Sequence, residues 1–247
     1  MGRRPQLHPD LLERIVDDPL AGRWLNHPLV YEASVPEDAE LIARVNERLE
    51  TKRVNVAKAR AQQDWRSYID LHELGHRFPA LASIRFDVPD GEFTELFGEL
   101  WIEHDGALHA HRDFINWVLE DKRLAPEKLM TEGERAKLAE LADVIEIYRG
   151  FSSDGTGNVE RGPSWTRSKK QAKWFACRDP TLALGKKWPH LARGTVAKKH
   201  VTAYFARRDE EEIVVLPSKV AIETIDRLSH QWTVARMWEA LGVTGPR

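Results

Sequence analysis

Apolar side chains recur at helical spacing through much of the first half of the chain. Within residues 37–70 they occupy positions 41, 45, 49 and 56, which would place them along one side of a helix. Pro36 stands just before this stretch, where a proline is compatible with the start of a helix. The same kind of pattern predicts further helices at residues 93–104, 107–121 and 132–142.

The pattern changes at about residue 143. Residues 143–151 alternate and carry β-branched side chains, which predicts a strand. A short extended segment, a helix and two more strands are then expected, at residues 163–166, 167–176, 196–206 and 210–217. Helices followed by strands indicate an α+β fold rather than an alternating one.

Composition is that of a globular protein without a membrane span. The 247 residues are 42% hydrophobic and 31% charged, and no apolar run approaches the roughly 18 residues that a spanning helix needs. The N-terminus lacks the apolar segment of a secretory signal. Cys177 is the single cysteine, which excludes an intramolecular disulfide and favours a reducing compartment. We expect a cytoplasmic location.

Positive charge is concentrated in one stretch of the second half. From Arg161 to Arg208 the one acidic residue is Asp179, although the net charge of the chain is −2. Such a region suits a phosphate-bearing ligand. A solvated helix face with exposed loops would have the same composition.

Residues 72–76 read His-Glu-Leu-Gly-His, the H-E-x-x-H pattern of zinc hydrolases. On a helix, His72 and His76 would share a face, and Glu73 could act as general base to a zinc-bound water. However, Gly75 and Pro79 weaken a helix here, and no third ligand stands out. We expect a polar helix end and no metal, with a zinc-dependent hydrolase kept as an alternative.

Three short stretches in the second half carry further candidate chemistry. Arg149 ends the strand pattern IEIYRGF, Ser164-Trp165-Thr166 forms a short extended segment, and Glu210-Glu211-Glu212 precedes an aliphatic run. Strand alternation would place Ser164 and Thr166 on one face, and Glu210 and Glu212 on one face. Each stretch alone is common in proteins, so the functional inference depends on the order in which the three occur.

In that order the stretches resemble the mono-ADP-ribosyltransferases of the arginine–serine–glutamate class, which include bacterial and phage toxins. The family pattern is an aromatic-Arg pair, then Ser-x-Ser/Thr opening a strand, then Glu-x-Glu before aliphatic residues. The resemblance covers about residues 93–220 and is most specific in SWTRSKKQAKWFA. Arg149 and Ser164 lie closer together than in many toxins of this class, a spacing shared by compact bacterial and phage-type relatives.

The resemblance implies a split β-sheet core that binds NAD⁺ as substrate, in a catalytic domain at residues 93–247. Residues 1–92 would be a helical region of unknown role. Glu212 would stabilise the ribosyl cation, and Glu210 would orient or deprotonate the acceptor. Arg149 would hold the pyrophosphate, and Ser164 would position Glu212.

The resemblance also implies supporting residues around the nicotinamide. The backbone of Gly150 would clamp the carboxamide, and Thr166 would brace its strand. Trp174 or Phe175 could stack near the nicotinamide, although at least one of them is expected to pack in the core. No metal ion is needed for this reaction.

The acceptor is expected to be a macromolecule. The Glu-x-Glu spacing slightly favours protein arginine, whereas the basic stretch fits nucleic acid. By family, a toxin or phage effector with an antitoxin or immunity partner is expected, and no membrane partner. A catalytically silent nucleotide-binding module is the other alternative.

Overall fold

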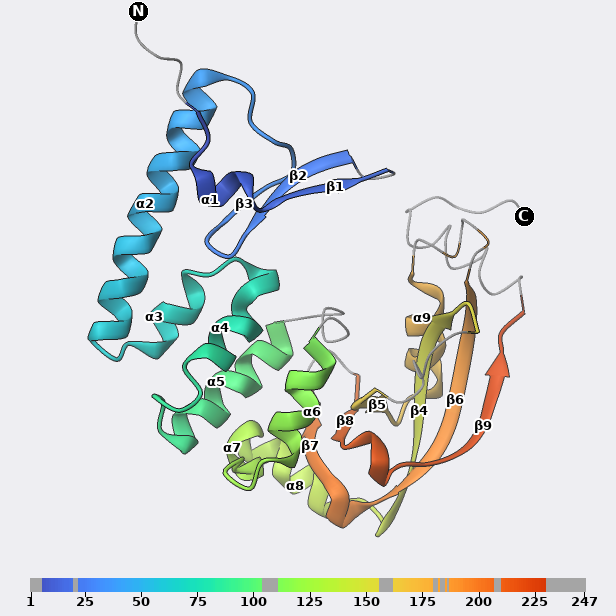
Figure 1. The fold of residues 1–247 in the computed structure, drawn as a ribbon. Helices are drawn as coiled ribbons and strands as arrows, with labels where there is room; N and C mark the ends of the chain where they lie inside the picture. Colours follow the sequence, from blue (N-terminus) through green and yellow to red (C-terminus); the bar gives the residue numbers. More distant parts are fainter. Residues whose placement is uncertain are drawn as a thin grey trace, which may run out of the picture. The chain divides into compact units, whose positions relative to one another are not determined.

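The computed structural model describes residues 6–19, 22–103, 111–155, 162–179, 182, 185, 187–206 and 210–229. Helices make up most of the first half, and a large antiparallel sheet makes up most of the second (Figure 1), which confirms the predicted α+β class. The chain divides into two compact units, Met1–His111 and Arg112–Arg247. Among the described helices, none has the length and apolar character needed to cross a membrane.

The N-terminal unit contains a small sheet that the helical pattern did not predict. Helix α1 (Pro9–Leu12) leads into antiparallel strands β1 (Ile15–Asp18), β2 (Gly22–His27) and β3 (Val30–Glu32), which lie in the order β1-β2-β3. These strands are short, and β1 and β2 consist largely of charged and polar residues. None therefore offers the run of alternating apolar positions by which a strand is recognised in sequence.

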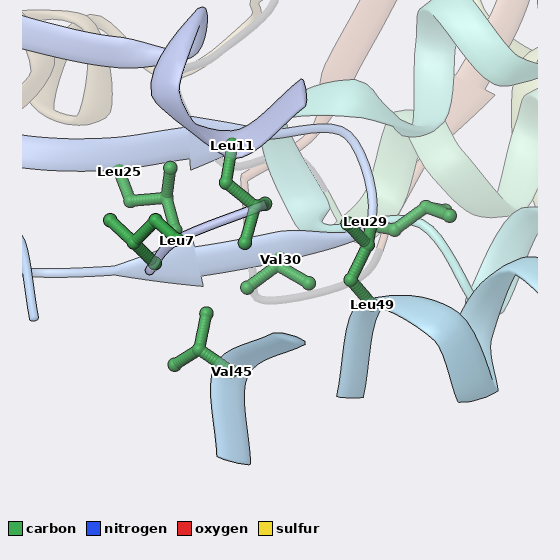
Figure 2. Packing of buried hydrophobic residues seen from close by; sticks show 7 residues of the cluster. All are labelled: Leu7, Leu11, Leu25, Leu29, Val30, Val45 and Leu49. Carbon is green, nitrogen blue, oxygen red and sulfur yellow. The ribbon is translucent and has the colours of Figure 1, made fainter. Parts of the chain in front are cut away.

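Seven buried apolar side chains pack this sheet against helix α2 (Ala39–Ala61), as Figure 2 shows. Two of them come from the helical pattern, which confirms that this side of α2 faces the core. The first position of that pattern, Leu41, is 41% exposed and lies outside the core. The seven side chains are Leu7, Leu11, Leu25, Leu29, Val30, Val45 and Leu49.

The single helix predicted over residues 37–70 is wrong, because the structure breaks it in two. Helix α2 ends at Ala61 and α3 begins at Trp65 and runs to Asp70. Between them Gln63 adopts a φ of 55°, and the Asp64 carboxylate accepts the Ser67 N–H at 3.1 Å to cap α3. No glycine or proline marks the break, so the apolar spacing alone could not reveal it.

Aromatic packing joins the remaining helices of this unit. Helix α4 (Arg77–Ser83) and helix α5 (Asp90–Glu103) meet through the rings of Phe78 and Phe97, 6.0 Å apart between centroids. Helix α5 confirms the helix predicted at 93–104. The domain boundary expected after residue 92 falls inside α5, and this packing against α4 keeps the whole helix in the N-terminal unit.

The C-terminal unit opens with three helices and continues as a six-stranded antiparallel sheet in the order β7-β8-β5-β4-β6-β9 (Figure 1). The predicted helices at 107–121 and 132–142 correspond to α6 and α8, although residues 107–110 lie outside the described part of the chain. The elements are α6 (Arg112–Glu120), α7 (Pro126–Leu129), α8 (Glu132–Glu140), β4 (Val144–Ser153), β5 (Ser164–Thr166), α9 (Lys169–Cys177), β6 (Trp188–Ala197), β7 (Val201–Phe205), β8 (Glu212–Val215) and β9 (Ala221–Arg227).

The strand predicted over residues 196–206 is divided by a turn at Lys198–His200. It joins the end of β6 to β7, which lies at the opposite edge of the sheet. Most of β6 and all of β9 were not predicted. Outside the turn, the predicted strands at 143–151, 163–166 and 210–217 and the helix at 167–176 appear as β4, β5, β8 and α9.

Candidate active site

Strand β5 lies between β4 and β8 and brings the three candidate stretches together. Thr166 of β5 stands opposite Tyr148 of β4 on one side and opposite Glu212 of β8 on the other. Thr166 and Glu212, which are far apart in sequence, thereby become neighbours on adjacent strands. The antiparallel register determines which side chains can meet.

Ser164 and Glu212 form a direct side-chain contact at this place. Ser164 is opposite Val214, so Glu212 is its diagonal neighbour on the same face. The Ser164 hydroxyl donates a hydrogen bond to Oε1 of Glu212, and both residues are half-buried. Such a bond holds the carboxylate in one orientation.

Arg149 is anchored on the segment that leads into β5. Its Nη1 donates to the backbone carbonyl oxygen of Ser164. The guanidinium also lies directly on Gly162, where a Cβ atom would come within 2.7 Å of Nη1 and closer still to the rest of the group. Gly162 therefore provides the space that Arg149 occupies, a role that the sequence analysis missed.

Strands β4 and β5 diverge beside Arg149. Their pairing consists of Tyr148 with Thr166, and the same register would next place Gly150 opposite Ser164. In the described residues that second pair is not formed, whereas β4 continues alongside β6 as far as Ser153. The sheet is therefore split next to the Ser164–Glu212 pair.

Gly150 lies under helix α9, and this close approach explains its missing side chain. A Cβ atom here would overlap the carbonyl oxygen of Ala172 and lie 2.6 Å from the backbone nitrogen of Ala176. Helix packing alone therefore requires glycine at this position. The role in binding nicotinamide stays a prediction.

Helix α9 also carries the two aromatic candidates. Trp174 and Phe175 meet edge to face with centroids 5.2 Å apart. The Arg178 guanidinium lies 5.4 Å from the Trp174 ring and 4.7 Å from the Phe175 ring. Trp174 is 37% exposed, so it is the more accessible of the two.

The three glutamates do not form one continuous extended segment. Strand β8 begins at Glu212, and Glu211 has a φ of 44°, in the left-handed region. The backbone N–H of Arg167 donates to the Glu211 carbonyl at 3.2 Å, and the Arg167 side chain pairs with the Glu211 carboxylate. Strand alternation therefore does not relate Glu210 to Glu212, which corrects the argument that placed them on one face.

Thr166 links this turn to helix α9. Its hydroxyl donates to the carbonyl oxygen of Glu210 and accepts the N–H of Ser168 at 2.9 Å. Ser168 then caps α9 by accepting the N–H of Gln171 at 3.2 Å. A single buried side chain thus connects β5, the segment before β8 and the start of the helix.

Several cations of the basic stretch are already paired with protein groups. Arg193 binds Glu223 at 2.8 Å, and Lys187 binds Asp179 at 3.3 Å. Beside the site, the pKa of the Tyr204 hydroxyl is raised, mainly because the side chain is buried. The basic stretch is therefore partly a set of local ion pairs.

The H-E-x-x-H stretch lies in the N-terminal unit and is not a helix. His72 follows the end of α3, and residues 74–76 form a separate 3₁₀ turn. Nδ1 of His72 bonds the Tyr68 carbonyl at 2.8 Å, whereas Nε2 of His76 bonds the Asn26 side chain at 3.0 Å. Burial lowers the pKa of both histidines. The two rings thus serve different local contacts.

Pro79 does not disrupt the helix in which it lies. Helix α4 begins at Arg77, so Pro79 stands in its first turn, where its missing N–H costs no helical hydrogen bond. Within the described part of the chain, no three His, Cys, Asp or Glu side chains are grouped as metal ligands.

Comparison of the chain with protein-family models, with curated proteins and with solved structures gives no match.

Proposed function

We propose that the C-terminal unit is a mono-ADP-ribosyltransferase that uses NAD⁺ as donor. The observation that carries this proposal is the hydrogen bond from Ser164 to Glu212 beside the split between β4 and β5. It joins two residues that the family resemblance names as partners, from strands that are far apart in sequence. The anchored Arg149 adds the third residue of the set at the same place.

The proposed reaction breaks the bond between C1′ of ribose and the nicotinamide nitrogen. The bonding electron pair leaves with nicotinamide, and positive charge develops on the ribose. A carboxylate held at that ribose would stabilise the cation, which is the role proposed for Glu212. The acceptor nucleophile then bonds to C1′ and loses its proton to a base, for which Glu210 is the candidate.

Ser164 and Arg149 would act mainly by positioning. The Ser164 hydroxyl restricts the Glu212 carboxylate, so that its charge is in place before the reaction begins. Arg149 donates one of its N–H groups to the backbone of β5. A guanidinium carries five N–H donors in a planar fork that matches phosphate oxygens, which is why Arg149 is the proposed contact for the NAD⁺ phosphates.

The test compares three single variants, Glu212→Gln, Glu210→Gln and Glu211→Gln, by measuring nicotinamide release and acceptor labelling in parallel. We expect Glu212→Gln to lower both activities by about a hundredfold to a thousandfold. Glu210→Gln should depress labelling more than the slow hydrolysis by water. Glu211→Gln should change both least, because the proposed reaction gives its carboxylate no role.

Glu223→Gln is the matched control, because Glu223 lies on β9 and pairs with Arg193. Incubation of labelled NAD⁺ with a cell lysate, followed by separate protease and nuclease digestion, identifies the acceptor class. Full turnover in the folded Glu212→Gln variant, or no nicotinamide release by the wild type, would refute the proposal. The second result would favour a catalytically silent module.

A further inference from the structure

One face of strands β4, β6 and β9 carries a row of planar side chains that the proposed chemistry does not use. Phe151 stands opposite His190, and His190 stands opposite Arg227, on three strands that lie side by side (Figure 1). Trp188 lies two residues before His190 on β6, so it shares the same face. We call Phe151, Trp188, His190 and Arg227 the stacking surface.

These four groups form two close pairs. The rings of Phe151 and His190 are 5.3 Å apart between centroids and inclined by only 14°. The Arg227 guanidinium lies 3.4 Å from the centre of the Trp188 ring. Phe151 is buried, whereas Trp188 is 42% exposed and Arg227 is also exposed. Trp188 and Arg227 are therefore accessible, and Phe151 is the buried member of the set.

The charge of this face differs from that of the opposite face. Arg149 stands opposite Ala192, two residues from Phe151, and belongs to the same face as the stacking surface. Glu146 and Glu223 both pair with Arg193, which alternates to the other face. Asp226 stands opposite Leu191 and lies there too. Among the described residues of these three strands, the acids therefore lie away from the stacking surface.

We propose that the stacking surface binds single-stranded nucleic acid. Unpaired bases stack on aromatic rings and on arginine planes whatever their sequence, and the arginines attract the phosphates. In a duplex the base faces are already stacked, so a duplex would not use these planes. A polypeptide would gain less, because it has neither a base to stack nor a repeating negative charge.

The position of the stacking surface also indicates a role for the bound nucleic acid. Phe151 and Arg149 are two residues apart on β4, a span of about 7 Å, so a nucleic acid bound here would pass close to Arg149, whose Nη1 donates to the backbone carbonyl of Ser164. We infer that the bound nucleic acid is the acceptor of ADP-ribose, an inference that rests on the proposed function. Protein arginine, which the Glu-x-Glu spacing slightly favours, is the competing acceptor.

The experiment measures binding of a fluorescein-labelled oligonucleotide of about ten nucleotides by anisotropy, without NAD⁺. We expect Trp188→Ala to weaken binding by about tenfold to a hundredfold, and Trp188→Phe to keep most of it. Arg227→Gln should reduce the slope of binding against salt by about 0.7. The matched control is Trp117→Ala, since Trp117 on α6 is also 42% exposed.

The outcomes separate this proposal from the proposed function. Equal affinity in wild type and Trp188→Ala, an equal loss in Trp117→Ala, or displacement of the oligonucleotide by saturating NAD⁺ would overturn the nucleic-acid site. The same holds if a duplex binds as tightly as the single strand. Trp188-dependent binding without any nicotinamide release would support the surface and refute the transferase. Labelling of protein alone in a lysate would overturn the acceptor assignment.

Discussion

The two units of this chain contain candidate motifs of opposite kinds. The N-terminal unit has the more conspicuous one, H-E-x-x-H, and its two histidines bond to different neighbours across a turn. The C-terminal unit has three inconspicuous stretches, and strands β4, β5 and β8 bring them into contact. A motif acquires chemistry only when its residues lie on the backbone geometry that the chemistry needs.

The same contrast holds for the polar groups around each motif. In the N-terminal unit, His27 is buried and accepts the N–H of Leu29 at 3.0 Å through Nδ1. In the C-terminal unit, the polar groups of Ser164, Arg149 and Glu212 remain half-buried beside a split in the sheet. The first arrangement satisfies a buried ring, and the second leaves polar groups partly exposed.

The largest effect is expected at Gly162, whose lack of a side chain leaves space for the Arg149 guanidinium. Gly162→Ala would push the Arg149 guanidinium from its place, and a shift of about 1 Å can cost about a hundredfold in rate. Nicotinamide release by the purified variant measures this. Gly133→Ala is the control, because a Cβ atom there meets nothing within 4 Å. Wild-type nicotinamide release by Gly162→Ala would show that Arg149 does not need the space that Gly162 leaves.

A second effect separates packing from chemistry at Gly150. Gly150→Ala should lower the free energy of unfolding by roughly 1–3 kcal/mol, since the new methyl group collides with the backbone of α9. Urea unfolding of this variant and of Gly133→Ala gives the comparison. An unchanged midpoint would mean that α9 can move away from β4 without cost.

Acidification should weaken the N-terminal unit through His27. Burial, with smaller contributions from the charges of Arg53 and Arg14, lowers the pKa of His27 to about 4. The unfolded chain binds this proton near the ordinary pKa of 6.5, so the contribution is complete above that pH and is lost as the pH falls toward 4.

We expect a loss of roughly 1–2 kcal/mol between about pH 7 and pH 5, measured by urea unfolding at both values. His27→Asn keeps a side-chain acceptor for Leu29 and removes this titration. The variant should therefore show a flatter dependence on pH. His200→Asn, in the C-terminal unit, is the control, and an equally flat profile there would contradict the assignment to His27.

Removal of the H-E-x-x-H histidines should affect folding rather than catalysis. His76→Ala loses one hydrogen bond to Asn26 and should cost about 1 kcal/mol of stability, with nicotinamide release within about twofold of the wild type. A chelator should leave that release unchanged. About one equivalent of zinc per chain, lost together with activity in His72→Ala, would restore the zinc-hydrolase alternative.

The smallest effect compares the two left-handed residues, one in each unit. Gln63→Gly should stabilise the chain by about 0.5–1 kcal/mol, because glycine adopts positive φ without a Cβ penalty. Glu211→Gly should gain less, since it also loses the ion pair with Arg167. Thermal unfolding of both variants decides the order. A larger gain at Glu211 would mean that the pair contributes nothing.

Pattern and order in the sequence predicted the α+β class, most helices and the strands that carry Arg149, Ser164 and Glu212. They did so because helical spacing and strand alternation are local, and the stretches 143–151 and 163–166 are clear examples. The small sheet at residues 15–32 escaped because its strands are short and largely polar. The break at Gln63 escaped because no glycine or proline marks it.

The sequence by itself determined which residue types are present and in what order, including the two ends of the Ser164–Glu212 pair. Only the tertiary structure decided that they touch, because a strand register relates residues far apart in the chain and leaves no local trace. It also decided that Glu211 interrupts the expected alternation and that Gly162 makes room for Arg149. Both depend on the close approach of separate segments, which no pattern within one segment can specify.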